Sequence, residues 1–147
     1  MNFKNIHIGN LIKMRVEESG VDEDRIINFF KLPVTKIEAM YEEEEISTEY
    51  LMRWSKLLEY DFFRLYSHHL ILYSPPAKGL KANKGNTESS LPIFRKNIYS
   101  QELISFILEQ IENKVMTRNE VIKEYGIPKS TLWKWDIKYS IKEKNEG

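Results

Sequence analysis

The chain of 147 residues contains no cysteine and only three histidines, His7, His68 and His69. Disulfides and thiolate zinc sites are therefore excluded, which fits a reducing intracellular setting. The two adjacent histidines would point about 100° apart on a helix, which is a poor arrangement for sharing one metal ion. We expect no metal site and no other cofactor.

Apolar runs of membrane-spanning length are also missing, and the first residues, MNFKNIHIGNLIK, lack the apolar core of a signal peptide. These absences predict a cytoplasmic protein that does not enter a membrane. The sequence has no glycine-rich phosphate loop, no Ser-His-Asp order and no cluster of metal ligands. We therefore expect the protein not to be an enzyme and to have no small-molecule substrate.

Charges balance overall, with 22 Lys and Arg against 22 Asp and Glu, but their distribution is uneven. Residues 1–74 hold 9 basic and 13 acidic side chains, a net of −4. Residues 75–95 hold 4 and 1, a net of +3, and residues 96–147 hold 9 and 8, a net of +1. Zero net charge by itself argues against a strongly basic nucleic-acid-binding protein. The uneven distribution indicates segments with different tasks.

The segment 75–95 predicts a flexible basic linker. It contains three of the prolines and two of the glycines of the chain, and it has too few large apolar residues to form a core. Its lysines are either simply solvated or in contact with DNA phosphates. They recur every three residues, at Lys78, Lys81 and Lys84.

The flanking segments predict an all-α protein, because apolar residues recur at helical spacing and no sustained alternation typical of strands occurs. We expect two small helical domains, with five helices in residues 1–74 and three in residues 96–147. The apolar residues expected to form the two cores are Ile8, Leu11, Ile12, Val16, Ile26, Ile27, Phe29, Phe30, Leu51, Trp54, Leu57, Leu58, Leu103, Ile104, Ile107, Leu108 and Ile111.

The stretch EYGIPKSTLWKW, residues 124–135, predicts a turn between two crossing helices. A capping box formed by Thr117 and Glu120 would begin the first helix. Gly126 would end it in a left-handed conformation, and Pro128 fits the first turn of the next helix. This order of three helices, with a short second helix and a glycine turn, is typical of a helix-turn-helix.

Helical spacing predicts a buried face and an exposed face for the last helix. Leu132, Trp135 and Tyr139 share one side and should form the core. The other side would present small hydrogen-bonding groups at the N-terminal end and cations along the helix, as a helix in the DNA major groove requires. The predicted DNA-binding residues there are Lys129, Ser130, Thr131, Lys134 and Lys138. Trp133 has two interpretations: it covers the rim of the core with Ile137, or it packs against sugars and thymine methyl groups.

The stretch RNEVIKEYGIPKSTLWKWDIKY resembles the helix-turn-helix of bacterial insertion-sequence transposases and of their small DNA-binding companion proteins. The matching residues are Gly126, Ser130, Thr131, Leu132 and Trp135. The resemblance covers about 45 residues and implies binding of double-stranded DNA. No segment matches the catalytic α/β domain of such transposases, so it implies a stand-alone transcriptional regulator or a DNA-reading accessory of a mobile element.

Residues 7–73 resemble, less closely, the five-helix domain of phage-repressor and Cro-like proteins. The match lies in the helix order and in FFKLPVTKIEAMYE. The resemblance places Val34, Thr35, Lys36 and Glu38 toward the groove, with Thr35 and Lys36 as further DNA-binding residues, and it places Ile37 and Met40 in the core. Two departures are Pro33 in the turn and the acidic run from Glu42 to Glu45, which is either a solvated face or an obstacle to phosphates.

Residues 62–73, FFRLYSHHLILY, contain more apolar side chains than one face of a small domain needs. They are expected either to fill the core or to form the two-fold interface of a homodimer. A sequence-specific DNA-binding protein is therefore the predicted function. The alternative is a protein-interaction adaptor that uses helix-turn-helix folds without DNA, which the acidic first half and the zero net charge favour.

Overall fold

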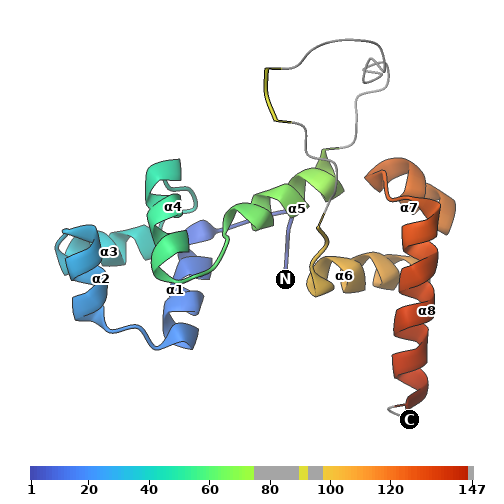
Figure 1. Ribbon diagram of the computed structural model, residues 1–147, viewed down its shortest axis with the longest axis horizontal. Coiled ribbons are helices and arrows are strands. Elements are labelled where there is room, and N and C mark those ends of the chain that lie inside the picture. The colour runs from blue at the N-terminus through green and yellow to red at the C-terminus, as the bar shows by residue number, and fades with distance from the viewer. Residues whose placement is uncertain (75–89, 93–97, 146–147) are drawn as a thin grey trace. The chain divides into compact units, whose positions relative to one another are not determined.

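The computed structural model describes residues 1–74, 90–92 and 98–145, with side chains as far as Tyr139. Every regular element in these ranges is an α-helix, so the predicted all-α class is confirmed (Figure 1). The elements are α1 (Ile8–Ser19), α2 (Glu23–Phe30), α3 (Val34–Tyr41), α4 (Thr48–Leu57), α5 (Phe63–Tyr73), α6 (Gln101–Glu112), α7 (Arg118–Tyr125) and α8 (Lys129–Asn145).

The chain divides into two compact units, Asn2–His69 and Leu70–Gly147, which we call the N-terminal and C-terminal units. The division falls within α5, slightly before the boundary expected at residue 74. Most of the predicted linker, residues 75–95, lies outside the described residues, as do Lys78, Lys81 and Lys84. The linker itself therefore stays a prediction.

The core of the N-terminal unit is built around Trp54, which is fully buried. The ring of Phe30, from α2, lies 4.4 Å from it, centroid to centroid, and the ring of Tyr41, from α3, lies 5.8 Å away. Aromatic contacts of this kind add stability beyond the area they bury. Of the apolar positions expected in this core, seven are buried: Ile8, Ile12, Ile26, Phe30, Leu51, Trp54 and Leu58. Leu11, Val16, Ile27 and Leu57 are half-buried, and Phe29 is exposed.

The acidic run after α3 caps α1 through its backbone. The carbonyl of Glu43 accepts the N–H of Gly9 at 3.0 Å, and the carbonyl of Glu44 accepts the N–H of Ile8 at 3.2 Å. The first amides of a helix have no partner within the helix, so these bonds satisfy groups that would otherwise cost stability. The side chains of Glu42 to Glu45 are all exposed. The run therefore has a structural role at the end of α3 farthest from Thr35.

The C-terminal unit contains α6, α7 and α8. Ser100 caps α6, since its hydroxyl accepts the N–H of Leu103 at 3.2 Å. Trp135 is 8% exposed, and its ring meets Tyr99 edge-on at 5.0 Å. The remaining buried apolar residues of these helices and their turn are Leu103, Ile104, Ile107, Val121, Ile127 and Leu132. Leu108 and Ile111, which were also expected in this core, are only half-buried.

The predicted capping box at the start of α7 is confirmed. The Thr117 hydroxyl accepts the N–H of Glu120 at 3.2 Å, and the Glu120 carboxylate accepts the N–H of Thr117 at 2.7 Å. These contacts lower the pKa of Glu120 below its ordinary value. The hydrogen bond from the Thr117 backbone N–H is the larger cause, and the hydrogen bond with the Thr117 side chain is the smaller. The carboxylate is thus more stable in the folded chain than in the unfolded chain.

This capping box predicts a pH dependence that a single substitution tests. Because the pKa of Glu120 is lower in the folded state, its contribution is fully present above the unfolded pKa of about 4.3 and is lost as the pH falls through the folded value. Glu120→Gln should therefore be less stable than the native chain at pH 7 and equally stable near pH 2. Urea unfolding followed by circular dichroism at both pH values measures this. The exposed Glu109→Gln is the control, and an equal deficit of E120Q at both pH values would contradict the prediction.

Candidate nucleic-acid interface

Three residues, Gly126, Ile127 and Pro128, connect α7 to α8. Gly126 adopts the left-handed conformation, with φ 63° and ψ 24°, as expected from the sequence. Ile127 is buried and anchors the turn in the core. Pro128 stands directly before α8, where its carbonyl accepts the N–H groups of Thr131 and Leu132 at 3.0 and 3.1 Å. The turn is therefore fixed by conformation, by packing and by hydrogen bonds.

The expected two-sided character of α8 is present. Leu132 and Trp135 are buried and Tyr139 is half-buried. Of the five predicted DNA-binding residues on this helix, four are exposed, whereas Thr131 is half-buried at the edge of the packed side. We define the outer face of α8 as its exposed residues between the start of the helix and Tyr139: Lys129, Ser130, Trp133, Lys134, Ile137 and Lys138.

Trp133 lies in the middle of this outer face. It is 63% exposed, and Ile137, one turn further along, is 42% exposed. Both side chains are therefore only partly covered, and a large part of the indole surface is open to a partner. At helical spacing, Lys129 precedes Trp133 by one turn, and Ser130 precedes Lys134 by one turn. An apolar stripe therefore runs beside a polar and cationic stripe.

The outer face of α8 carries three lysines and no carboxylate. The one acidic residue of this part of the helix, Asp136, is engaged: its Oδ2 lies 2.9 Å from Nε of Arg118, at the start of α7. The hydrogen bond to Asp136 raises the pKa of Arg118 above its ordinary value, and the negative charge of Asp136 adds a smaller effect in the same direction. Asp136 follows Lys129 by seven residues, so Arg118 is held at the border of the outer face as an additional cation.

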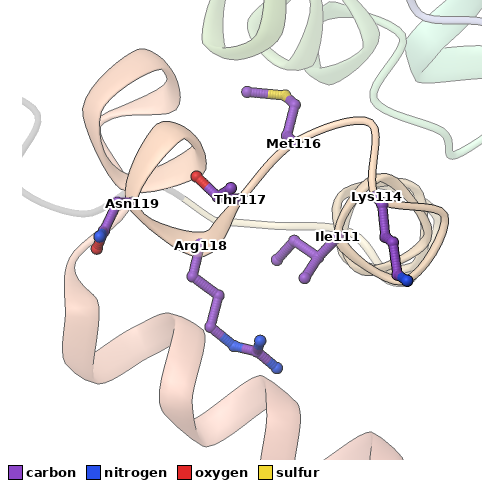
Figure 2. Close-up of a pocket in the computed structure, with 6 residues that line it drawn as sticks. All are labelled: Ile111, Lys114, Met116, Thr117, Arg118 and Asn119. Atoms are coloured by element: carbon purple, nitrogen blue, oxygen red, sulfur yellow. The ribbon is translucent and has the colours of Figure 1, made fainter.

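Beside this ion pair, an open hollow of about 480 Å³ lies at the start of α7 (Figure 2). Its lining includes two cations, Lys114 and Arg118, together with the polar side chains of Thr117 and Asn119. No carboxylate is among its lining residues, which are completed by Ile111 and Met116. Figure 2 shows the Arg118 side chain extending from the start of α7 toward α8. Neither the hollow nor this ion pair was expected from the sequence, because Arg118 and Asp136 are far apart along the chain.

The connection between α2 and α3 repeats the connection between α7 and α8. Each consists of an eight-residue helix, a left-handed residue, an apolar residue, a proline and a further helix. Lys31, with φ 57° and ψ 35°, occupies the position that Gly126 has in the second connection. Pro33 likewise corresponds to Pro128. Buried residues follow the same register: Ile26 and Val121, Ile37 and Leu132, and Met40 and Trp135.

This repeat was not expected from the sequence, in which Pro33 counted as a departure from the repressor-like turn. The left-handed residue of this turn is Lys31, which a search of the sequence for glycine does not identify. The sequence did contain one sign of the repeat, an apolar residue followed by proline, at Leu32-Pro33 and at Ile127-Pro128. The spacing between these two pairs equals the spacing between the apolar residues that flank them. Pro33 is therefore compatible with this turn and does not disrupt it.

On α3 the expected core residues Ile37 and Met40 are buried, as predicted. Thr35, Lys36 and Glu38 are exposed, and Val34 is half-buried. The exposed side of α3 thus combines one cation with one anion, unlike the outer face of α8.

The apolar segment 62–73 is largely packed. Phe62, Leu65 and Leu72 are buried, and among its apolar residues only Leu70 and Tyr73 are classed as exposed. Core packing therefore accounts for many of the apolar side chains of residues 62–73, and the homodimer interface stays a prediction.

No protein-family model, curated protein or solved structure matches this chain. None of the helices in the described ranges has the length and apolar surface needed to cross a membrane. In the same ranges, no three side chains of histidine, aspartate or glutamate gather closely enough to hold a metal ion.

Proposed function

We propose that the protein is a non-catalytic, sequence-specific DNA-binding protein in which α8 enters the major groove. The observation that carries this proposal is the outer face of α8, where Lys129, Lys134 and Lys138 are exposed without a carboxylate among them. The phosphates of double-stranded DNA attract such a surface, and displacement of their counterions supplies much of the affinity. The biological role is that of a transcriptional regulator or a DNA-reading accessory of a mobile element.

The beginning of α8 suits contacts with base edges. Ser130 is exposed and Thr131 half-exposed in the first turn, where short hydroxyl side chains can donate to and accept from either strand. The three-residue turn holds α7 and α8 in the order used by helix-turn-helix proteins, whose second helix inserts its N-terminal part into the groove. The resemblance to insertion-sequence transposases rests on these same residues.

Cations beside the outer face would hold the duplex backbone. Arg118 is fixed by Asp136, and Lys114 lies across the adjoining hollow. Contacts of this kind position a protein on the duplex without reading its sequence. The ion pair leaves part of Arg118 free to meet a phosphate, since its side chain is still 60% exposed.

Thr35 and Lys36 form a second, weaker contact in this proposal. They occupy the same positions after their turn as Ser130 and Thr131 do after theirs. The exposed Glu38 on the same helix, however, reduces attraction to phosphates, so we assign the main affinity to α8. A homodimer through residues 62–73 would place two copies of α8 on one duplex, with Leu70 and Tyr73 as its exposed apolar residues.

The second candidate function is a protein-interaction adaptor. The observations favouring it are the exposed apolar pair Trp133 and Ile137 and the acidic character of residues 1–74. An adaptor would bury this pair in the pocket of a partner, whereas a DNA-binding protein would place it in the groove.

Fluorescence anisotropy of a labelled random 20-base-pair duplex pool, titrated with the full chain at three salt concentrations, tests the proposed function. We expect binding that weakens steeply with salt, with a slope set by the number of phosphates contacted. Sequence selection from the pool should then enrich a defined site. Absence of binding at low salt would overturn the proposal and leave the adaptor.

A further inference from the structure

We propose that Trp133 recognises thymine in the bound duplex by packing its indole ring against the C5-methyl group. This inference rests on the proposed function, because it assigns a role to one residue of the surface that would enter the groove. Its consequence is that the recognised site contains thymine at a defined position opposite the middle of α8.

The position of Trp133 excludes two ordinary uses of a tryptophan. A core tryptophan is buried, as Trp54 and Trp135 are, whereas Trp133 is 63% exposed. A residue that only contacts phosphates would be cationic or hydrogen-bonding, and the indole offers a single N–H donor on a large apolar surface. The exposed part of the indole is available to an apolar partner outside its own unit.

The surroundings of Trp133 indicate what that partner is. Lys129 and Lys134 border it, and no exposed carboxylate lies on the outer face of α8. A surface of this charge fits the anionic duplex, and it fits an acidic protein only if that protein also offers a pocket. In the major groove, the C5-methyl of thymine is the one apolar group that the four unmodified base pairs present. An exposed apolar side chain between lysines therefore matches thymine better than any other base.

Ile137 strengthens this assignment. It is 42% exposed and follows Trp133 by one helical turn, so the two side chains lie on the same side of α8. Ile137 continues the apolar stripe about 6 Å further along the helix axis and would border the methyl group that Trp133 covers. The polar stripe of Ser130, Lys134 and Lys138 would remain available for hydrogen bonds and phosphates.

The test uses the full chain and the tightest duplex selected from a random 20-base-pair pool. Each thymine of that duplex is replaced in turn by deoxyuridine, which removes only the methyl group and keeps every hydrogen bond. We expect one replacement to weaken binding of the native chain about fourfold, the value of about one buried methyl group. For Trp133→Ala, the thymine and deoxyuridine duplexes should bind equally. Met52→Ala, which removes an exposed apolar side chain from the N-terminal unit, should retain the fourfold difference.

The outcomes separate this inference from the proposed function. If the native chain binds but no deoxyuridine replacement matters, the role of Trp133 is overturned and DNA binding stands. If the fourfold difference persists in W133A, another residue reads the methyl group and the assignment is wrong. If the native chain binds no duplex at any salt concentration, the proposed function fails and this inference falls with it. Circular dichroism of W133A establishes that the exposed position tolerates the change.

Discussion

Replacement of Lys129, Lys134 and Lys138 together by alanine is expected to weaken duplex binding about a hundredfold at 0.1 M salt and to reduce the salt slope by about three. The reason is that the three ammonium groups are exposed on the outer face of α8 and would each displace about one counterion from the DNA. Anisotropy titrations at several salt concentrations measure both quantities. The fold should be unaffected, because none of the three side chains is buried.

The control variant removes the same charge from the other unit. Lys4, Lys13 and Lys56 are exposed in the N-terminal unit, and their triple replacement by alanine should change binding only slightly. A double variant of Thr35 and Lys36 should have an intermediate effect, less than about tenfold, because one cation is lost beside Glu38. Equal losses for both triple variants would show that net charge alone governs binding, and the assignment of α8 would then be wrong.

Substitution of Gly9 by alanine is expected to destabilise the N-terminal unit by about 3 kcal/mol, at the upper end of the usual cost of overpacking. A β-carbon at this position would lie 2.5 Å from the carbonyl oxygen of Tyr41 and 2.7 Å from that of Glu43, and it would also meet the carbonyl of Met40. These are backbone atoms, and Glu43 accepts the N–H of Gly9 itself, so the clash cannot be relieved without losing the cap of α1. Urea unfolding of the full chain measures the change.

Gly20 supplies the matched control for this prediction. It ends α1 at φ 64° with no atom near the position of an added β-carbon. Gly20→Ala should therefore cost only the strain of a left-handed alanine, about 1 kcal/mol. The indole N–H signals of Trp54 and Trp135 report on the two units separately in nuclear magnetic resonance spectra. A loss at Trp135 equal to that at Trp54 in G9A, or equal costs for the two glycines, would contradict the explanation.

Much of the local structure was predictable because neighbouring residues determine it. The capping box of Thr117 and Glu120, the caps at Ser47 and Ser100 and the left-handed Gly126 follow from side-chain chemistry within three or four residues. Helical periodicity likewise identified most of the buried residues, such as Ile8, Trp54 and Leu132, because one face of a helix must be apolar to pack.

Features that join distant segments were not predictable in the same way. The acidic run was weighed as an obstacle to phosphates, whereas its backbone carbonyls cap α1. The cost of replacing Gly9 depends on the carbonyls of residues 40, 41 and 43, which no helical pattern associates with it. The pairing of Arg118 with Asp136 and the exposure of Trp133 depend on how α7 and α8 pack.

The sequence by itself determined the all-α class, the residues that begin and end most helices, and the two-sided pattern of α8. Short-range hydrogen bonds and the period of the helix require these features whatever the helices pack against. Only the tertiary structure decided that Lys31 takes the left-handed conformation of its turn and that Asp136 is paired. It also decided how far Trp133 is exposed, which the helical pattern had left open. The physical reason is that packing between helices selects one side of each, and that selection depends on contacts far apart in the chain.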